Sequence, residues 1–346
     1  MKVAILGGGF CGATLAKELD NEKDIQVTLI DKHSYFEYNP SAHKCLTNPG
    51  YQRHIQVPFS HFLHHTEIVT EPIKKLFPSE VHTRSKRIGF DYGVLCLGCS
   101  YPIFLENKKN VFTLTRSDDA KELFKALKDA KKVLIVGGGY IGTEIAGELA
   151  TKRSDLQITM VHSHDRILER NTNFASKSAL KFLKKRGVNF VFNDLVIDHP
   201  EDYKFKTKKG KTINADVCIW CAGVRADTSF LEGFSDSTVD KSGRIRVNES
   251  LQLVDYPHFF AGGDLTDIKE EKTARKAELH AKVIALNLRR MNQGKSLIPY
   301  TSGRSPMVIS LGDNHGIGQY GKLVVPGLLS GIGKWLIEWW TLRQFY

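Results

Sequence analysis

The chain has 346 residues, of which 41% are hydrophobic and 25% are charged, and its formal net charge is +11. This length exceeds what one hydrophobic core usually serves, so two or three domains are expected, and the composition excludes a disordered chain. The positive charge favours anionic partners. However, the basic residues occur in short scattered groups without a nucleic-acid-binding motif, so nucleic acid is not an expected partner.

The first residues run directly into an apolar stretch without a charged leader, and no uncharged apolar run reaches about 18 residues. We therefore expect neither a signal peptide nor a transmembrane helix. Six cysteines without a signal indicate free thiols in a reducing compartment, so a cytoplasmic location is expected.

The first predicted unit is a strand, a glycine turn and a helix within residues 3–19. In Gly7-x-Gly9-x-x-Gly12 the first glycine permits a tight turn, the second lets the backbone approach a pyrophosphate, and the third lets helix and strand pack closely. Asp31 ends the next strand, 24 residues after Gly7, where an acid accepts hydrogen bonds from ribose hydroxyls. A bound dinucleotide is therefore predicted here.

A crossover follows, in which residues 111–115 predict a strand and Ser117 is expected to cap a helix. The strand–turn–helix pattern then returns in residues 133–149, where nine of seventeen positions match the first copy. The second copy places its turn glycines at Gly137, Gly139 and Gly142. Two such units predict two dinucleotide sites.

The ribose position of the second unit, 25 residues after Gly137, is His162 rather than an acid. An acid there would repel a 2′-phosphate, whereas a histidine does not, and Arg166 and Arg170 are near in sequence. The choice between NAD and NADP therefore stays open.

The two predicted helices also begin differently, because the second carries Thr143-Glu144 where the first has Ala13-Thr14. A carboxylate within a turn of a pyrophosphate repels the phosphates, and the helix dipole offsets only part of this repulsion. One interpretation is an ordinary acid in a first turn. The other is a catalytic carboxylate of Glu144 that faces the contact between nicotinamide and flavin.

Beyond the second unit, the sequence predicts a basic hairpin over residues 204–212 and a strand over residues 215–221. The last section, residues 301–346, has a glycine-rich stretch and a tryptophan-rich tail. The tail has two faces at helical spacing. The apolar face comprises Leu328, Ile332, Trp335, Leu336, Trp339, Leu342 and Tyr346, and the other face comprises Lys334, Glu338 and Thr341.

Trp and Tyr beside Lys and Arg suit a membrane interface, so the tail predicts an amphipathic helix on an anionic membrane surface. Gly331 and Gly333 are expected to delay the start of this helix. The alternative is a helix that docks on the core of its own chain.

Two nucleotide units 130 residues apart, together with Ala261-x-Gly263-Asp264, resemble the pyridine-nucleotide-dependent flavoprotein reductases. The resemblance implies that the first unit binds FAD, that the second binds NAD(P)H as co-substrate, and that Asp264 holds the flavin ribityl chain. Gly98 matches a family position that closes the first half of the FAD domain, and Gly223 matches a family position near the nicotinamide. The resemblance also implies cofactor contacts at the residues inside and after the glycine turns, namely Phe10, Cys11, Lys32, Tyr140, Ile141 and His162.

Within this family the sequence is most similar to type II NADH:quinone oxidoreductases and to the ferroptosis-suppressor branch related to apoptosis-inducing factor. Residues 136–149, 161–163, 246–249, 279–281 and 340–344 carry this similarity. In those relatives the glutamate that matches Glu144 lies by the flavin. Met1-Lys2 lacks the glycine that N-myristoylation needs, so no such lipid anchor is expected.

The resemblance implies an α/β fold with two Rossmann-like domains and a short membrane-associating C-terminal segment. The FAD-binding domain is expected at residues 1–103 and 223–300, the NAD(P)H-binding domain at residues 104–222, and the C-terminal segment at residues 301–346. The implied activity is hydride transfer from NAD(P)H to FAD and two-electron transfer to a quinone. Alignment with relatives assigns quinone contacts to Asn39, Pro40 and Lys276. A homodimer stays open.

The cysteines bear on the alternatives to quinone reduction. Disulfide reductases need two neighbouring cysteines at the flavin, and residues 36–50 contain only Cys45. A single cysteine could serve an NADH oxidase, a peroxidase or a CoA-disulfide reductase, although only 82 residues follow Asp264 (346 − 264), too few for the dimer domain of those relatives. Sulfide:quinone oxidoreductase and a non-catalytic FAD redox sensor are further alternatives.

The pairs Cys96-x-x-Cys99 and Cys218-x-x-Cys221 resemble zinc-binding spacing. Each pair lies on or just after a predicted strand, where residues i and i+3 point to opposite faces. No metal site is therefore expected.

Overall fold

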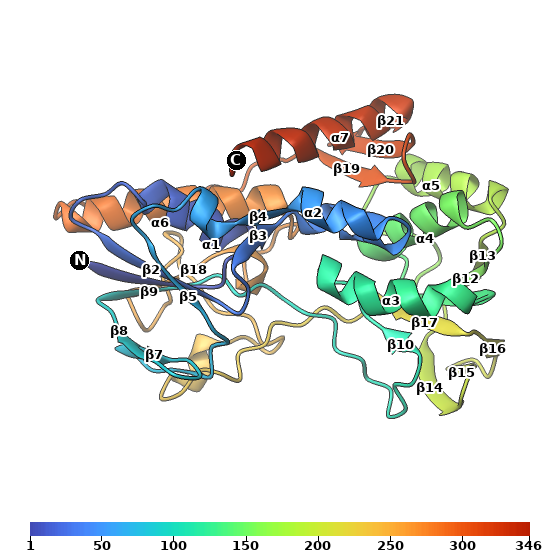
Figure 1. Cartoon of the computed structure of the whole chain (residues 1–346), viewed down its shortest axis with the longest axis horizontal. Helices are drawn as coiled ribbons and strands as arrows, with labels where there is room; N and C mark the ends of the chain where they lie inside the picture. Colours follow the sequence, from blue (N-terminus) through green and yellow to red (C-terminus); the bar gives the residue numbers. More distant parts are fainter.

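The computed structural model describes the whole chain, from Met1 to Tyr346. Two five-stranded parallel sheets form its body and lie on opposite sides of Figure 1. The first sheet has the order β18 (Phe259–Ala261), β9 (Tyr92–Leu95), β1 (Lys2–Leu6), β2 (Gln26–Asp31) and β5 (Glu67–Thr70). The second has the order β10 (Val111–Phe112), β17 (Val217–Trp220), β11 (Lys132–Val136), β12 (Gln157–His162) and β13 (Asn189–Phe192). The predicted α/β fold with Rossmann-like sheets is therefore confirmed.

The two sheets repeat the same local design. Lys2 pairs with Gln26 at the start of β1 and β2, and Lys132 pairs with Gln157 at the start of β11 and β12. The central strands are buried on both faces because helices cover the sheets, which explains their continuous apolar sequences. The glycine turns thus leave the two sheets at equivalent edges.

The helices connect these strands. Their bounds are α1 (Phe10–Leu19), α2 (Gln52–Ile55), α3 (Ser117–Asp129), α4 (Tyr140–Lys152), α5 (Asn173–Lys185), α6 (Ala274–Asn292) and α7 (Leu328–Arg343). Helices α1 and α6 pack together beside the first sheet (Figure 1). A 3₁₀ helix, η1 (Asn39–Leu46), contacts α3 and α4 and so joins the first unit to the second.

Short antiparallel elements complete the fold. They are β3 (Tyr35–Glu37) with β4 (Gln56–Pro58), the sheet β6 (Lys75–Leu76), β7 (Glu80–His82) and β8 (Arg87–Gly89), and the sheet β14 (Val196–Glu201), β15 (Lys204–Thr207) and β16 (Thr212–Asn214). Strands β15 and β16 form the predicted basic hairpin.

The C-terminal section has more structure than the tail helix alone. Strands β19 (Met307–Ser310), β20 (Gly316–Tyr320) and β21 (Leu323–Gly327) form an antiparallel sheet, and α7 lies against it. In Figure 1 α7 runs across the top of the molecule from the side of α5 towards α1. At its end, the Phe345 ring stacks on the Phe36 ring of the first unit at 4.2 Å. None of the helices combines the length and apolar content that a membrane crossing requires.

Two local predictions were wrong. The glycines of α7 do not delay its start, because the helix begins at Leu328 and includes both; a Cβ at Gly331 would lie 2.8 Å from the Asn314 backbone, so this glycine permits close packing. Ser117 does not cap α3, because Arg116 occupies the cap position and its N–H donates to the Asp119 carboxylate at 3.0 Å.

Candidate functional site

The glycine turns are fixed by their own backbone. Gly7 and Gly137 have φ of 101° and 107°, a region that favours glycine. A Cβ at Gly12 would overlap the carbonyl oxygen of Gly7, and a Cβ at Gly142 would overlap that of Gly137. Strand and helix therefore approach each other as closely as the sequence pattern predicts.

The middle glycine of each turn faces open space instead. A Cβ at Gly9 or Gly139 would meet no atom of the chain within 4 Å. Each of these glycines is the N-cap of its helix, α1 or α4, and no side chain caps the helix N–H groups. Free N–H groups beside an open cradle fit a pyrophosphate, so both turns suit the FAD and NAD(P)H that were predicted for them.

Asp31 closes the first turn at the end of β2. Its Oδ2 accepts from Gly8 N at 2.6 Å, and its Oδ1 accepts from His33 N at 2.8 Å. Burial alone would raise the pKa of this carboxyl, but the hydrogen bonds from His33 and Gly8 lower it. A pocket of about 490 Å³ opens here, and Lys32 lies in its wall with Tyr35. These groups suit the adenosine end of a dinucleotide.

The remaining positions predicted for FAD differ in what they offer. Asp264 follows β18, and burial raises the pKa of its carboxyl. Gly98 has a φ of 70° and faces open space. The side chains of Phe10 and Cys11 point inward instead, because the Phe10 ring lies edge-on to Phe36 at 5.1 Å and a Cβ at Gly262 would overlap Cys11 Sγ.

The positions predicted for NAD(P)H surround the second turn. His162 ends β12 and accepts from Gly138 N at 3.1 Å. The Tyr140 hydroxyl lies 3.4 Å from Glu271 Oε2, whereas Ile141 packs against the apolar core. Gly223 has a φ of 76°, and a Cβ there would lie 2.7 Å from the Phe104 ring.

Glu144 points away from the pyrophosphate cradle. Its buried Oε1 accepts from Ser310 N at 3.0 Å and lies 2.9 Å from Lys334 Nζ of α7, and its Oε2 lies 4.0 Å from His43 Nδ1 of η1. Burial alone would raise the pKa of the Glu144 carboxyl, but Lys334 and His43 lower it. The carboxylate therefore joins α4 to the C-terminal helix, a connection that sequence analysis missed.

The 3₁₀ helix η1 begins at Asn39 and Pro40. His43 is fully buried within it, its Nε2 has no hydrogen-bond partner, and burial lowers the pKa of this histidine to about 4. Burial and the nearby Glu37 raise the pKa of the Cys45 thiol to about 12. A thiolate at Cys45 is therefore disfavoured at neutral pH.

A second buried acid fixes α7 to the same region. Glu338 lies 2.9 Å from Lys44 Nζ, 3.3 Å from His54 Nε2 and 2.5 Å from Ser41 Oγ, and the Tyr51 hydroxyl also donates to it. Burial alone would raise the pKa of the Glu338 carboxyl, but Lys44 and the donated hydrogen bonds lower it. Helix α7 thus docks through its polar face.

The apolar face of α7 points away from the protein. Its exposed side chains are Leu328, Leu329, Ile332, Trp335, Leu336, Ile337, Trp339 and Trp340. We call this set the outer face of α7. Leu342 was predicted on this face but is buried, and the neighbouring strands add exposed Tyr320, Leu323 and Val325.

Lys276 lies elsewhere, at the start of α6. Its buried ammonium is 3.0 Å from Glu270 Oε2, donates to Ser302 Oγ at 3.0 Å and donates to the Gly303 carbonyl at 2.5 Å. A quinone contact at Lys276 would therefore have to compete with these internal partners.

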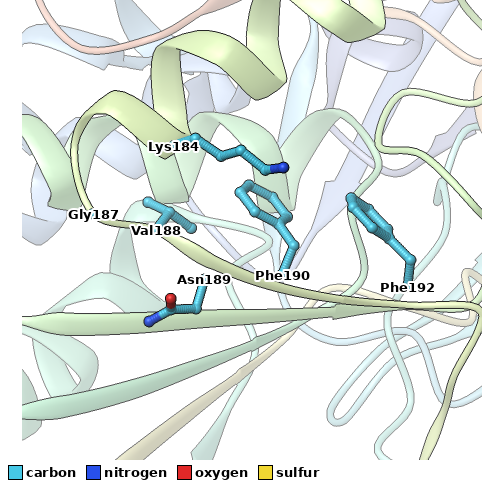
Figure 2. A pocket seen from close by; sticks show the side chains of 6 residues that line it. All are labelled: Lys184, Gly187, Val188, Asn189, Phe190 and Phe192. Carbon is cyan, nitrogen blue, oxygen red and sulfur yellow. The ribbon is translucent and has the colours of Figure 1, made fainter.

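A surface pocket of about 400 Å³ opens at the edge strand β13. Figure 2 shows Phe190 and Phe192 side by side in its wall, with the Lys184 ammonium above them. None of its lining residues belongs to a glycine turn, so we assign this pocket no part in nucleotide binding.

Comparisons with known proteins cover most of the chain. It is 29% identical over 322 residues to apoptosis-inducing factor homolog A of Dictyostelium discoideum, which covers 85% of this chain and 78% of that protein. It is 25% identical over 348 residues to ferroptosis suppressor protein 1 of Taeniopygia guttata, which covers 96% of this chain and 92% of that protein.

Among solved structures, NDH2 from Plasmodium falciparum in complex with NADH has a similar fold, with a TM-score of 0.86 at 15% identity over 99% of this chain and 94% of that chain. The model of the pyridine nucleotide-disulphide oxidoreductase family matches residues 1–281. The chain therefore belongs to this family of flavoproteins, which use FAD with NAD(P)H.

Proposed function

We propose that this chain is an NAD(P)H:quinone oxidoreductase that takes its quinone from a membrane surface. The observation that carries the proposal is the pair of Glu144 and Lys334. It joins α4, just after its first turn and beside the predicted nicotinamide site, to a helix with an exposed apolar outer face. The outer face and the Glu144–Lys334 pair lie on opposite sides of α7, so an acceptor collected on that face would be one helix diameter, ~10 Å, from the pair.

Bound FAD supplies the two-electron carrier between NAD(P)H and the acceptor. The residues of the chain do the rest. The open cradles at Gly9 and Gly139 orient the two dinucleotides, which converts their reaction into a step within one complex. Asn39 and Pro40, at the start of η1, are proposed to line the acceptor side, on the same short helix as buried His43.

Quinone reduction balances as NAD(P)H + H⁺ + quinone → NAD(P)⁺ + quinol, so the acceptor gains two electrons and two protons. The Glu144 carboxylate and the Lys334 ammonium are 2.9 Å apart and shielded from water. The lowered pKa keeps the Glu144 carboxylate ionised, so the proton to be passed to a quinone oxygen is on the Lys334 ammonium, which this carboxylate positions. We therefore propose Glu144 as the catalytic carboxylate.

The outer face of α7 supports a membrane as the source of the quinone. Its tryptophan and leucine side chains form one contiguous stripe on a helix that already has its polar side satisfied by the protein. Large exposed apolar patches mark interaction surfaces, and an interfacial helix buries such a stripe among lipid headgroups and acyl chains. The net charge of +11 would add attraction to anionic lipid.

A thiol relay has less support. The raised pKa of Cys45 removes the thiolate that disulfide or peroxide chemistry needs. The other cysteines are also free thiols, and burial raises the pKa of Cys99 to about 11. A non-catalytic redox sensor remains as the second candidate function, favoured by the relatedness to apoptosis-inducing factor homologs.

Anaerobic stopped-flow mixing tests the proposal. We expect NADH to bleach the flavin absorbance, and a soluble short-chain quinone to restore it faster than dioxygen, a disulfide or a peroxide does. Cys45→Ser should behave as wild type, because it removes only a buried thiol. Rapid recovery with a disulfide alone, lost in Cys45→Ser, would overturn the proposal in favour of thiol chemistry. Slow recovery with every acceptor would favour the sensor.

A further inference from the structure

The second nucleotide site has a histidine seated where the first has an aspartate. At the end of β2, Asp31 Oδ2 accepts from Gly8 N at 2.6 Å. At the end of β12, His162 Nδ1 accepts from Gly138 N at 3.1 Å. The two side chains thus receive the same backbone hydrogen bond from equivalent turns.

This hydrogen bond fixes the imidazole of His162. Because Nδ1 accepts, the neutral ring carries its proton on Nε2. That Nε2 lies 3.2 Å from Glu169 Oε2 and donates to it. Burial lowers the pKa of His162, so the ring is neutral at physiological pH and adds no positive charge beside Glu169. An acid, Glu169, therefore lies directly beyond His162, the residue at the predicted ribose position.

The same residues could suggest a metal site, because potential ligand atoms of His162, His164 and Glu169 lie within 4.8 Å of one another. Both nitrogens of His162 are already committed, however. Nδ1 uses its lone pair for Gly138 N–H, and Nε2 carries the proton that Glu169 accepts. His162 therefore has no lone pair to offer a cation.

The arginines nearby do not form a phosphate site. Arg166 Nη2 donates to the backbone carbonyls of Glu169 at 2.8 Å and Asn171 at 3.3 Å, and Nη1 donates to Asn173 Oδ1. Its guanidinium is thus used to shape the loop. Arg170 is exposed and lies 4.0 Å from Glu169 Oε1 and 3.8 Å from Glu271 Oε2, so its nearest charged partners are two carboxylates and it donates no hydrogen bond to either.

We propose that Glu169, held by His162, makes the second site select NADH over NADPH. Glu169 is 26% exposed at its side chain, and its Oε1 makes no hydrogen bond, so this oxygen can accept from the ribose hydroxyls of NADH. The 2′-phosphate of NADPH would instead meet a carboxylate. This inference rests on the NAD(P)H half of the proposed function and not on the acceptor.

Equilibrium titration of the oxidised holoprotein with NAD⁺ and NADP⁺ tests the inference, together with the rates of flavin reduction by NADH and NADPH without any quinone. We expect wild type to bind NAD⁺ at least about tenfold more tightly than NADP⁺. Glu169→Gln keeps the shape of the side chain and an acceptor for His162 but removes the charge. The preference for NAD⁺ over NADP⁺ should therefore fall about tenfold, mainly because NADP⁺ binds more tightly.

Two further variants control for a structural effect. Glu169→Asp keeps the charge and should keep the preference for NAD⁺. Glu271→Gln removes the other carboxylate beside Arg170 and should leave the ratio within about twofold. A wild type that binds NADP⁺ as tightly as NAD⁺, or an unchanged ratio in Glu169→Gln, would overturn the inference. Because no acceptor is present, a failure of quinone turnover would leave this result unaffected.

Discussion

At the scale of single residues, glycines that share one sequence motif have different neighbours. Gly9 and Gly139 face open space with an ordinary φ of −74°, whereas a Cβ at Gly12 would overlap backbone. The space beside Gly9 and Gly139 is therefore free for a ligand, whereas the fold itself requires a glycine at Gly12.

This difference predicts separable defects. Gly9→Val should give a folded protein without flavin, because the new side chain enters only the space of the pyrophosphate. Gly139→Val should keep FAD and lose binding of NAD(P)H. Gly12→Ala should lower thermal stability, since its Cβ meets the Gly7 carbonyl. Flavin content and thermal melts check all three, and a yellow Gly9→Val protein would contradict the FAD assignment of the first turn.

Glu144 is the residue on which electron transfer to the acceptor is expected to depend. Glu144→Gln should retain FAD and reduction by NADH but slow reoxidation by quinone at least about tenfold, because the carboxylate that positions the Lys334 ammonium is lost. It should also destabilise the fold by about 3 kcal/mol, since Lys334 is left buried without its partner.

The double variant Glu144→Gln with Lys334→Met separates these effects. It should regain stability, because no buried charge remains unpaired, but not the rate of reoxidation. Unchanged reoxidation in Glu144→Gln would leave Glu144 as a structural acid of α4.

His43 should make folding stability depend on pH. In the unfolded chain its imidazole binds a proton near the ordinary pKa of 6.5, whereas in the folded protein burial lowers this pKa to about 4. Between these values the unfolded state holds more protons, so the free energy of unfolding falls as pH drops from 6.5 to 4, by about 3 kcal/mol.

Denaturant unfolding at pH 7 and pH 4 checks this, with His43→Leu as the comparison. His280, whose pKa burial also lowers to about 4, adds its own dependence in both proteins. The loss of stability should therefore be smaller in His43→Leu than in wild type. An equal loss in both proteins would mean that folded His43 titrates normally.

Sequence analysis predicted the glycine turns because a repeat and short motifs specify them locally, whereas the cofactor roles of Asp31 and Asp264 stay predictions. It did not find the partners of Glu144, since Ser310 and Lys334 are 166 and 190 residues away in the chain. It also left the cofactor preference open, because Glu169 lies in a loop after β12 without periodicity and acts through His162.

At the scale of elements, α7 shows what periodicity can and cannot predict. The two faces were recognised from helical spacing, but a hydrophobic face ordinarily turns inward. Here the polar face turns inward instead, because Glu144 of α4 and Lys44 of η1 provide charged partners for Lys334 and Glu338. Those partners belong to other elements, so the sequence of the helix alone could not reveal the orientation.

This orientation changes how the membrane prediction is best tested. Deletion from Lys334 onward would expose Glu144 and remove Phe345, which is buried against Phe36. The double variant Trp335→Ser with Trp340→Ser is cleaner, because these side chains are 53% and 64% exposed. It should weaken binding to anionic liposomes about tenfold or more and leave the melting temperature and FAD content unchanged.

Phe174→Ser is the matched control, since Phe174 is an exposed aromatic residue on α5 rather than α7. Its liposome binding should equal that of wild type, and added salt should weaken binding in both. Liposome binding of the tryptophan variant that equals wild type would remove α7 as the membrane contact.

At the scale of the whole molecule, the α/β class followed from two copies of one pattern, and the resemblance to flavoprotein reductases covered most of the chain. The way in which the elements of the candidate site come together could not be predicted from this repeat or from the resemblance. It combines α4, η1, β19 and α7, which come from three separated parts of the sequence and meet only through tertiary packing. Strands β19–β21 were also missed, because their sequence was taken as a glycine-rich stretch.

The most direct test of the central claim is steady-state NADH oxidation on anionic vesicles, with a long-chain quinone in the bilayer or a short-chain quinone in solution. We predict that wild type turns over both quinones. The Trp335→Ser, Trp340→Ser variant should lose most of its rate with the long-chain quinone and keep its rate with the short-chain quinone. Equal rates of variant and wild type with the long-chain quinone, or no turnover of either quinone by wild type, would contradict the claim.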